Sequence, residues 1–428
     1  MARRPLIALA DPEWVGHRET YFREFALSLH RLEAEVVALC PYPARLQEWG
    51  EATQPPLARL HARPLVEPRR FPVLRRLPQD PVTTQLRWRM LRTALATEET
   101  RLGRQVDLIF LPWLDSYLRA SLHNRLTLGA QARSWAGLYF RPHHLVPPVG
   151  ANGSASRFSA LRNFSKGDAL LRSKSCKAIA TLDETLRPAL HHASGKPILP
   201  FPDITDETAP HADTPFAKQI RAVAQGRKVI GLIGMEPRKG VITMLRAADL
   251  ARKANHPWLF VLAGVDCLSL YTPEERQFVQ EHINRCRQGD PQSNVLFPEK
   301  FAPIPDGAVF NGIMNTFDIL FVAYHNFLGS SNVLTKAAVL QKLVVSTDLG
   351  CIAHRTKEFD LGLAIPQGDA QACCEAIERL TRGVRWNGEP LRPRYSDYHA
   401  LHSRACLDQS MAELLSLANA PTPNALAA

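Results

Sequence analysis

The sequence lacks the long apolar segments of membrane-spanning and secreted proteins. It contains no run of about 18 consecutive apolar residues, which argues against a membrane-spanning helix. The apolar stretch near the start extends only from Leu6 to Ala10, because Asp11 and Pro12 follow it. This stretch is too short for the apolar core of a signal peptide, so we expect a cytoplasmic protein.

The sequence also lacks the cysteine spacing that is typical of metal-binding and redox motifs. The eight cysteines include no Cys-x-x-Cys pair and stand at positions 40, 176, 267, 286, 351, 373, 374 and 406. Such a scatter through apolar segments of a long chain is typical of reduced core residues, and it favours neither a disulfide framework nor a metal site.

Several motifs that would define a chemistry are absent. No Gly-x-Gly-x-x-Gly fingerprint, Walker loop, His-Glu-x-x-His, nucleophile elbow or paired Asp-x-Asp stands at an expected strand end. We therefore expect no metal site, no dinucleotide fingerprint and no triad hydrolase.

The sequence has an excess of positive charge. The formal net charge is +11, and a basic balance suits anionic partners. Residues 44–80 are rich in proline, which predicts irregular structure. Arginines gather in the segment 59–92, where only Glu67 and Asp80 oppose them. Two interpretations stay open: a solvated insertion, or a surface patch for an anionic lipid headgroup or acceptor.

The hydrophobic pattern of the first half alternates between strands and helices. A buried strand at 5–10, an amphipathic helix at 19–32 and a strand at 35–40 form one β-α-β unit. Parallel pairing with a right-handed crossover is its simplest packing. Further strands are predicted at 106–111, 135–140 and 177–182, and the segment 197–202 follows them.

A second alternating series follows a segment rich in Pro, Asp and Thr at 202–216, which we take as a domain boundary. Strands are predicted at 229–234, 258–264, 294–297, 318–324 and 342–347, and helices at 240–253, 273–286, 331–340 and 370–380. The fold class is therefore α/β, with two Rossmann-like, doubly wound domains at 1–205 and 206–394. An amphipathic stretch at 395–417 precedes a disordered tail at 418–428.

The strongest candidate site is the segment Gly234–Gly240, which lies between a strand and a helix. Glycine at 234 lets the backbone approach a ligand. Arg238 and Lys239 place two positive charges at the start of the helix, where a diphosphate would bind. The alternative is a solvated loop whose charges face water.

Ser330, Ser331 and Asn332 form a second candidate between a strand and a helix. Either serine is expected to cap the helix, whose first N–H groups could bind a phosphate. Every capped helix has such a start, so this signal is weak by itself.

Two further candidates lie in the first half. His143, flanked by Arg141 and His144, follows a strand and could hold a sugar hydroxyl or transfer a proton, although a surface histidine would look the same. Gly16 and His17 open the first helix and could approach a ligand.

These segments together resemble a known family. Residues 233–247 (IGMEPRKGVITMLRA) and 317–350 (FDILFVAYHNFLGSSNVLTKAAVLQKLVVSTDLG) are similar to the C-terminal domain of group 1 retaining glycosyltransferases of the GT-B fold. The Gly-His before the first long helix and the Pro-His after a central strand fit the same pattern. The resemblance is strongest across 229–368.

The resemblance implies a nucleotide-sugar donor bound mainly by the second domain and an acceptor bound by the first. Arg238 and Lys239 would hold the diphosphate as catalytic residues, and His143 would lie beside the donor sugar. The residues expected to bind the nucleotide-sugar are Gly16, His17, Gly234, Ser330, Ser331, Asn332 and Lys336. Transfer would proceed with retention and without a metal, and the helix at 395–417 would cross back to the first domain.

One departure from the family concerns the helix that begins near residue 331. Lys336 stands where the family has a glutamate that binds the nucleotide ribose, and an ammonium group only donates hydrogen bonds. The nucleotide is then held differently, the donor is unusual, or activity is lost. The alternative function is therefore a non-catalytic GT-B protein with a binding or regulatory role.

The expected partner is a nucleotide-sugar, which is a substrate, so no cofactor is expected. The acceptor stays unidentified, with an anionic or membrane-associated molecule as the candidate class and a peripheral membrane location to match. A nucleotide-sugar epimerase and a nucleic-acid-binding protein are the remaining alternatives. No recognisable motif of stacking aromatic residues supports nucleic-acid binding.

Overall fold

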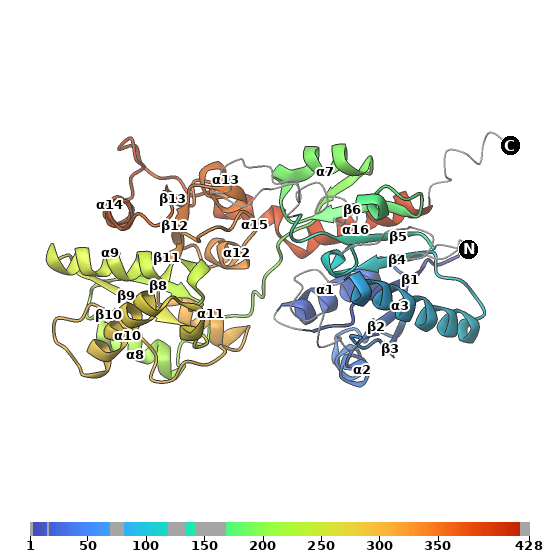
Figure 1. Ribbon diagram of the computed structural model, residues 1–428, viewed down its shortest axis with the longest axis horizontal. Helices are drawn as coiled ribbons and strands as arrows, with labels where there is room; N and C mark the ends of the chain where they lie inside the picture. Colours follow the sequence, from blue (N-terminus) through green and yellow to red (C-terminus); the bar gives the residue numbers. More distant parts are fainter. Residues whose placement is uncertain (1–2, 15–16, 69–80, 119–132, 143–167, 420–428) are drawn as a thin grey trace. The chain divides into compact units, whose positions relative to one another are not determined.

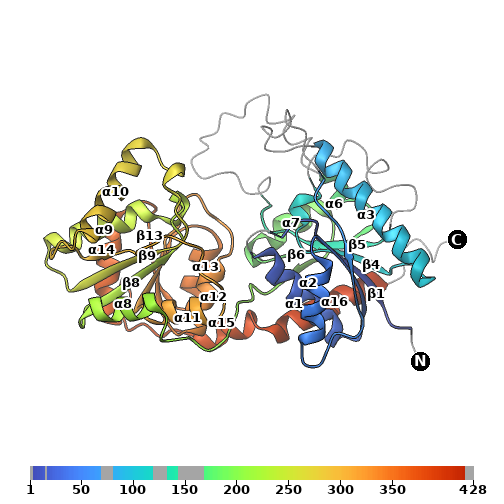
Figure 2. The same ribbon diagram turned by 90° about the horizontal axis from the view of Figure 1, so that it is seen from below.

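The chain folds into two compact units. The computed structural model describes residues 3–14, 17–68, 81–118, 133–142 and 168–419. The first unit comprises Met1–Pro202 together with Ser403–Ala428, and the second comprises Asp203–His402. Each unit is a sheet of strands covered by helices (Figure 1; Figure 2).

The first unit contains a seven-stranded parallel sheet with the order β3-β2-β1-β4-β5-β6-β7. The interior strand β1 is buried along its whole length and pairs with β2 on one side and β4 on the other. The strands are β1 (Leu6–Ala10), β2 (Glu35–Cys40), β3 (Leu60–Pro64), β4 (Leu108–Leu111), β5 (Trp135–Leu138), β6 (Cys176–Thr181) and β7 (Ile198–Pro200).

Helices bury the apolar side chains of this sheet. Phe25 of α1 packs edge-on against Phe110 of β4, with ring centroids 5.2 Å apart. The last helix, α16, packs on α1, and Arg404 forms hydrogen bonds of 2.8 and 2.9 Å with Glu24. The helices are α1 (Arg18–Arg31), α2 (Pro43–Ala52), α3 (Pro81–Leu102), α6 (Asp168–Leu171), α7 (Arg187–Ser194) and α16 (Arg404–Asn419).

The second unit repeats the plan with a six-stranded parallel sheet of order β10-β9-β8-β11-β12-β13. Its strands are continuous apolar runs, because successive side chains pack alternately into two hydrophobic cores on opposite faces of the sheet. In β8, Ile230 lies in one core and Val229 in the other. The strands are β8 (Lys228–Ile233), β9 (Trp258–Ala263), β10 (Val295–Leu296), β11 (Ile319–Val322), β12 (Leu343–Thr347) and β13 (Gly362–Ile365).

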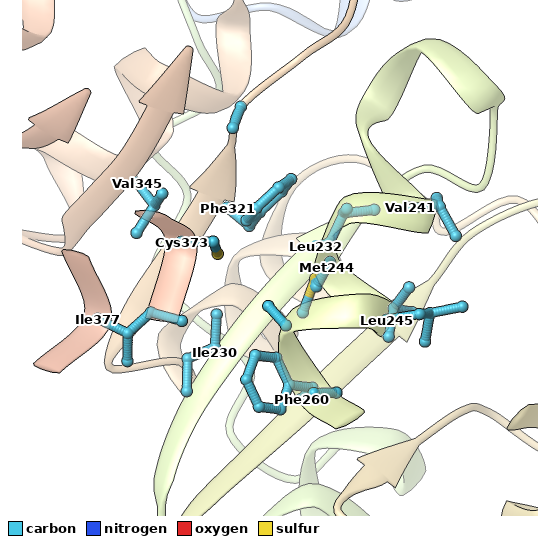
Figure 3. Packing of buried hydrophobic residues seen from close by; sticks show 14 of the residues in the cluster. Ile230, Leu232, Val241, Met244, Leu245, Phe260, Phe321, Val345, Cys373 and Ile377 are labelled. Atoms are coloured by element: carbon cyan, nitrogen blue, oxygen red, sulfur yellow. The ribbon is translucent and has the colours of Figure 1, made fainter. Parts of the chain in front are cut away.

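Figure 3 shows one of these cores, in which Met244 and Leu245 of α9 pack with Phe260, Phe321 and other strand residues. Helices α9, α10 and α14 supply this core, and the remaining helices supply the other. The helices are α8 (Pro215–Ala224), α9 (Val241–Lys253), α10 (Pro273–Arg287), α11 (Ala308–Asn315), α12 (Asn332–Val339), α13 (Gly350–Glu358), α14 (Ala370–Thr381) and α15 (Tyr395–Leu401).

All eight cysteines are free thiols, as the sequence predicts. Cys373 lies fully buried in the core of Figure 3, and burial raises its pKa well above the usual value. Among the described residues, no helix is long and apolar enough to cross a membrane.

The expectation of irregular structure at 44–80 is wrong for residues 44–52 and 60–64, which form a helix and a strand. Helix α2 begins at Pro43, where a missing N–H costs nothing because the first turn has no intrahelical acceptor. Strand β3 ends at Pro64 and lies at the edge of the sheet, where proline is tolerated.

The expectation of one continuous helix at 395–417 is also wrong. Helix α15 ends at Leu401, and α16 begins at Arg404. Between them, the ring Nδ1 of His402 accepts a hydrogen bond of 3.0 Å from the backbone N–H of Asp203. The break therefore coincides with the return of the chain to the first unit.

Candidate functional site

In each sheet, the strand order reverses beside the strand that comes first in sequence. Ligands of doubly wound folds bind outside the carboxyl ends of the strands at this switch point. In the second unit the switch point lies between β8 and β11, which are paired neighbours. We therefore expect a ligand site at the residues that follow these strands, which are Gly234–Gly240 and Tyr324–Ser331.

The turn after β8 depends on glycine. Gly234 has φ of +107°, and a side chain at this position would lie 3.0 Å from Glu236 and 3.2 Å from Lys239. Gly240 has φ of +80°, and a Cβ there would lie 2.5 Å from the carbonyl oxygen of Ala323. These glycines let the turn pack directly on the end of β11. Between them, Pro237–Lys239 form a short 3₁₀ helix, η4.

Lys239 points from this turn toward β11. Its Nζ donates a hydrogen bond of 2.9 Å to the hydroxyl of Tyr324 and lies 4.2 Å from the centre of the same ring. Within the described part of the chain, no carboxylate lies within ion-pair distance of this half-buried ammonium group. Arg238 is more exposed, lies 3.6 Å from Glu236 and packs over Phe327 at 5.4 Å.

The start of α12 meets the same tyrosine. Ser331 occupies the N-cap position, but its hydroxyl donates to Tyr324 at 3.2 Å and does not cap the helix. The expectation of a serine side-chain cap is therefore wrong. Ser330 instead donates to the carboxylate of Asp203, and its hydroxyl accepts a hydrogen bond of 2.7 Å from Arg355.

Other predicted ligand-binding residues hold the first residues of the second unit. The amide of Asn332 donates to the carbonyl of Ile204 at 2.6 Å and accepts from the hydroxyl of Thr205 at 3.0 Å. The buried ammonium group of Lys336 donates to the Asp206 carbonyl and lies 3.0 Å from the carboxylate of Asp306.

The ammonium group of Lys336 also donates a hydrogen bond of 2.9 Å to the side-chain oxygen of Asn311. Three protein oxygens therefore lie within 3.2 Å of the ammonium nitrogen. The structure brings Lys239 and Ser331 together through Tyr324, whereas Ser330, Asn332 and Lys336 bind the segment Asp203–Asp206, which we call the entry segment.

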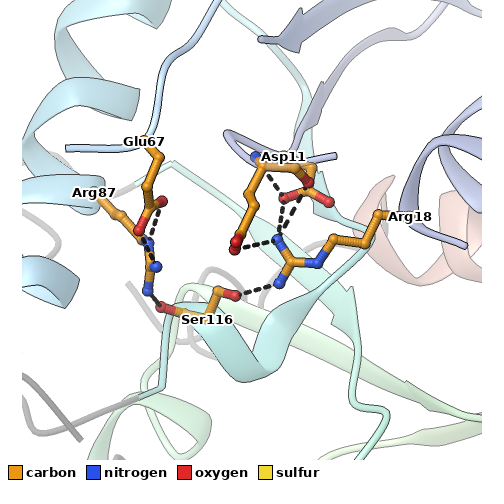
Figure 4. Close-up of polar contacts among 6 residues, drawn as sticks. Asp11, Arg18, Glu67, Arg87 and Ser116 are labelled. Carbon is orange, nitrogen blue, oxygen red and sulfur yellow. Dashed lines mark hydrogen bonds and ion pairs between the residues drawn. The ribbon is translucent and has the colours of Figure 1, made fainter. Parts of the chain in front are cut away.

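The switch point of the first unit holds a buried charge cluster (Figure 4). Arg18, at the start of α1, donates to Asp11 at 3.1 Å, to Glu13 at 3.0 Å and to the hydroxyl of Ser116 at 2.7 Å. Arg87 of α3 donates to the Ser116 carbonyl at 2.8 Å and pairs with Glu67.

Asp11 follows β1 and is fully buried. Its Oδ2 has no hydrogen-bond partner among the described residues. Burial raises the pKa of this carboxyl to about 7, although the neighbouring Arg18 opposes the shift. The cluster ties together segments that follow or flank different strands, and it holds a carboxyl that gains a proton near neutral pH.

Two described arginines of the 59–92 segment, Arg59 and Arg63, pair with acids outside that segment, whereas Arg87 pairs with Glu67 inside it. Arg63 donates to Glu98 at 2.9 Å, and Arg59 lies 3.6 Å from Glu33. The sequence places no acid beside these arginines, so only the fold reveals the pairing.

The structure describes only some of the remaining candidate residues of the first unit. His143, His144 and Gly16 lie outside the described residues. His17 is exposed at the N-cap of α1 and makes no side-chain cap. The backbone N–H of Arg141 donates to Asp115 at 2.9 Å.

The sequence reasoning did not single out Tyr324 and His325. His325 contacts the hydroxyl of Thr243 at 2.8 Å, and burial lowers the pKa of its imidazole. Tyr324 is the last residue of the strand predicted at 318–324 and His325 follows it, so a complete survey of strand ends would have found them.

Comparison with known proteins agrees with the resemblance. Residues 227–382 match the family model described as glycosyl transferases group 1. No curated protein matches the sequence significantly.

Solved structures confirm the GT-B fold over nearly the whole chain. Sucrose-phosphate synthase from Thermosynechococcus elongatus has 16% identity and a TM-score of 0.62, covering 97% of this chain and 98% of its own. A UDP-forming trehalose-phosphate synthase from Burkholderia xenovorans has 13% identity and a TM-score of 0.60, covering 98% and 100%. HepE from Anabaena, solved with UDP and glucose, has 14% identity and a TM-score of 0.59, covering 97% and 100%.

Proposed function

Because residues 227–382 match the group 1 glycosyltransferases, we propose that this protein transfers a sugar from a nucleotide-sugar donor to an acceptor. The observation that carries the proposal is the ammonium group of Lys239 at the β8–β11 switch point. It is half-buried, rests on the neutral hydroxyl of Tyr324, and has no carboxylate partner in the described part of the chain. A half-buried cation without an acid is suited to an anionic ligand.

In the proposed reaction, the diphosphate of the donor binds at Lys239 and Arg238. The bond between the anomeric carbon of the sugar and the diphosphate oxygen breaks, and the hydroxyl oxygen of the acceptor forms a new bond to that carbon. Negative charge builds on the leaving phosphate oxygen. Cations already in place stabilise that charge in the transition state, by a few kcal/mol for each group of this kind. Arg238 would have to exchange its contact with Glu236 for the phosphate.

Transfer with retention and without a metal is part of this proposal. The departing phosphate would accept the proton of the acceptor hydroxyl, so that no protein base is needed. The first unit would bind the acceptor, for which an anionic or membrane-associated molecule stays the candidate class. We also propose a cytoplasmic location, which the eight free thiols support.

The test is a thermal-shift screen of nucleoside diphosphates and nucleotide-sugars, in the presence of EDTA. A ligand of the native state raises the melting temperature by mass action. We expect a shift with one nucleotide, lost in Arg238→Ala/Lys239→Ala. The matched control is Arg246→Ala/Lys253→Ala, which removes two exposed charges from α9. An equal shift in both double variants would remove Arg238 and Lys239 from the site.

Activity with the nucleotide-sugar so identified would then be measured, and the anomeric configuration of the product determined by NMR. An inverted product would overturn the proposal of retention. Loss of turnover in EDTA, restored by a divalent metal, would overturn metal independence.

One observation favours the alternative of a non-catalytic binding protein. The resemblance places Lys336 where the family has a glutamate, and the ammonium group of Lys336 contacts Asp206, Asp306 and Asn311. Nucleotide binding without turnover of any tested donor would support this alternative.

A further inference from the structure

Tyr324 connects two elements of the proposed donor site. It follows β11 and is only 1% exposed. Its hydroxyl oxygen accepts one hydrogen bond from Lys239 at 2.9 Å and another from Ser331 at 3.2 Å. These two bonds use both lone pairs of the phenol oxygen. A single buried hydroxyl thus joins η4 to the start of α12.

The backbone around Tyr324 is held by contacts that do not involve its hydroxyl. The N–H of His325 donates to the Arg238 carbonyl at 2.8 Å, and the ring of His325 contacts Thr243 at 2.8 Å. Gly240 packs against the carbonyl of Ala323 so closely that a Cβ would lie 2.5 Å away. The ring of Tyr324 packs edge-on against Phe327 at 5.6 Å. Removing the hydroxyl alone should therefore leave the loop in place.

A neutral partner has a specific physical effect on Lys239. A free lysine side chain samples many rotamers, and ordering it on ligand binding costs entropy. A carboxylate partner would order the side chain but would also neutralise the charge that attracts an anion. The phenol oxygen orders the ammonium group without neutralising it, and two of its three hydrogens stay free to bind a ligand.

We infer that Tyr324 is a positioning residue for the diphosphate of the donor, acting by holding the ammonium group of Lys239 at the start of α12. The inference rests on the proposed function. It adds to that function the group that orients the ammonium of Lys239, which is the hydroxyl of Tyr324 in contact with both Lys239 and Ser331.

The experiment measures the affinity of the full-length protein for inorganic pyrophosphate and for UDP by isothermal titration calorimetry. Tyr324→Phe keeps the ring and removes the oxygen. We expect its dissociation constants for both probes to rise about fivefold to tenfold, the effect of losing one hydrogen bond of ordinary strength. Without ligand, the melting temperature should fall by only a few degrees, because Ser331 loses its acceptor while the backbone contacts around Tyr324 remain.

The matched control is Tyr398→Phe. Tyr398 is also buried, and its hydroxyl lies 3.2 Å from the hydroxyl of Thr335. This variant loses a buried hydroxyl without changing the surroundings of Lys239, so its affinity for pyrophosphate should equal that of the wild type.

A double-mutant cycle separates positioning from general support of the fold. In a Lys239→Ala background, Tyr324→Phe should cause no further loss of pyrophosphate affinity, because the group that it positions is gone. Additive losses would show that Tyr324 acts independently of Lys239 and would overturn the inference.

The outcomes for the inference and for the proposed function are distinct. Wild-type protein that binds pyrophosphate or UDP, with unchanged affinity in Tyr324→Phe, overturns the positioning role and leaves the donor site standing. Wild-type protein that binds neither probe overturns both.

Discussion

At the scale of single residues, Lys336 is a buried side chain that connects separate parts of the second unit. Its ammonium group is buried and bound to Asp206, Asp306 and Asn311. These acceptors lie on the entry segment, the residues before α11, and α11 itself. The lysine therefore fastens three parts of the second unit to α12.

This arrangement predicts that Lys336→Met is a stability variant. The methionine fills the space of the aliphatic chain but leaves the acceptors unpaired, which should lower the free energy of unfolding by about 1–3 kcal/mol. Chemical denaturation measures the loss, with the exposed Lys357→Met as control. The affinity for pyrophosphate should fall far less than in Lys239→Ala. A larger fall than in Lys239→Ala would instead place Lys336 at the ligand.

Asp11 predicts a pH dependence of stability. Its pKa is about 7 in the folded chain against an ordinary value of 3.8, so the native state binds the extra proton between these values. The stabilisation is fully present below about pH 4 and is lost as the pH rises through 7. Asp11→Asn keeps an acceptor for Arg18 and removes the titration.

Denaturation of wild type and Asp11→Asn at pH 5 and pH 8 tests this. Relative to the variant, the wild type should lose free energy of unfolding between the two pH values. The exposed Asp213→Asn serves as control and should show no such difference. A constant difference for Asp11→Asn would mean that the Asp11 carboxyl stays ionised throughout.

At the scale of secondary-structure elements, α16 completes the core of the first unit. Leu407, Met411 and Leu414 are fully buried, and the ion pair of Arg31 with Asp408 fixes the helix at its outer edge. A helix from the far end of the chain therefore belongs to the packing of the first residues.

We predict that Leu414→Ala destabilises the first unit by about 2–5 kcal/mol, because it leaves a cavity under α16. Glu413→Ala, the exposed neighbour, should be close to neutral. Thermal unfolding followed by tryptophan fluorescence reports the effect. Equal melting temperatures for the two variants would show that α16 contributes little to this core.

The pattern of elements was largely predictable from sequence, and the side-chain contacts were not. Strands such as β8 and β11 are continuous apolar runs, so their existence follows from composition. The sequence does not predict strand β3 and helix α2, because clustered prolines indicate irregular structure although proline is tolerated at helix starts and sheet edges.

The sequence predicts residues of the candidate site only where basic residues and glycine occur together after a strand. Arg238 and Lys239 follow a strand and could be found by that rule. The role of Ser330 could not, because its partner Asp203 is 127 positions away in sequence. Long-range pairing of this kind is fixed by tertiary structure, which local patterns do not encode.

At the scale of the whole molecule, the two units differ in continuity. The second is a single segment, Asp203–His402, with cores on both faces of its sheet, whereas the first is built from two separated segments. The second unit should therefore be separable from the first.

We predict that the fragment 203–402 unfolds cooperatively by itself and binds pyrophosphate with the affinity of the full chain. Circular dichroism and calorimetry measure both properties. A chain that ends at His402 should by contrast lack a cooperative transition for the first unit. An unfolded 203–402 fragment would show that the second unit depends on the first.

The split first unit has a consequence for synthesis on the ribosome. The sheet that begins at Leu6 cannot receive α16 until the whole second unit has been translated, which adds 200 residues (402 − 203 + 1). At common translation rates this interval lasts roughly 10 to 40 s. During that time the apolar surface that Leu407, Met411 and Leu414 later cover is open to chaperones. The half of the protein that is made first is thus the half that is finished last.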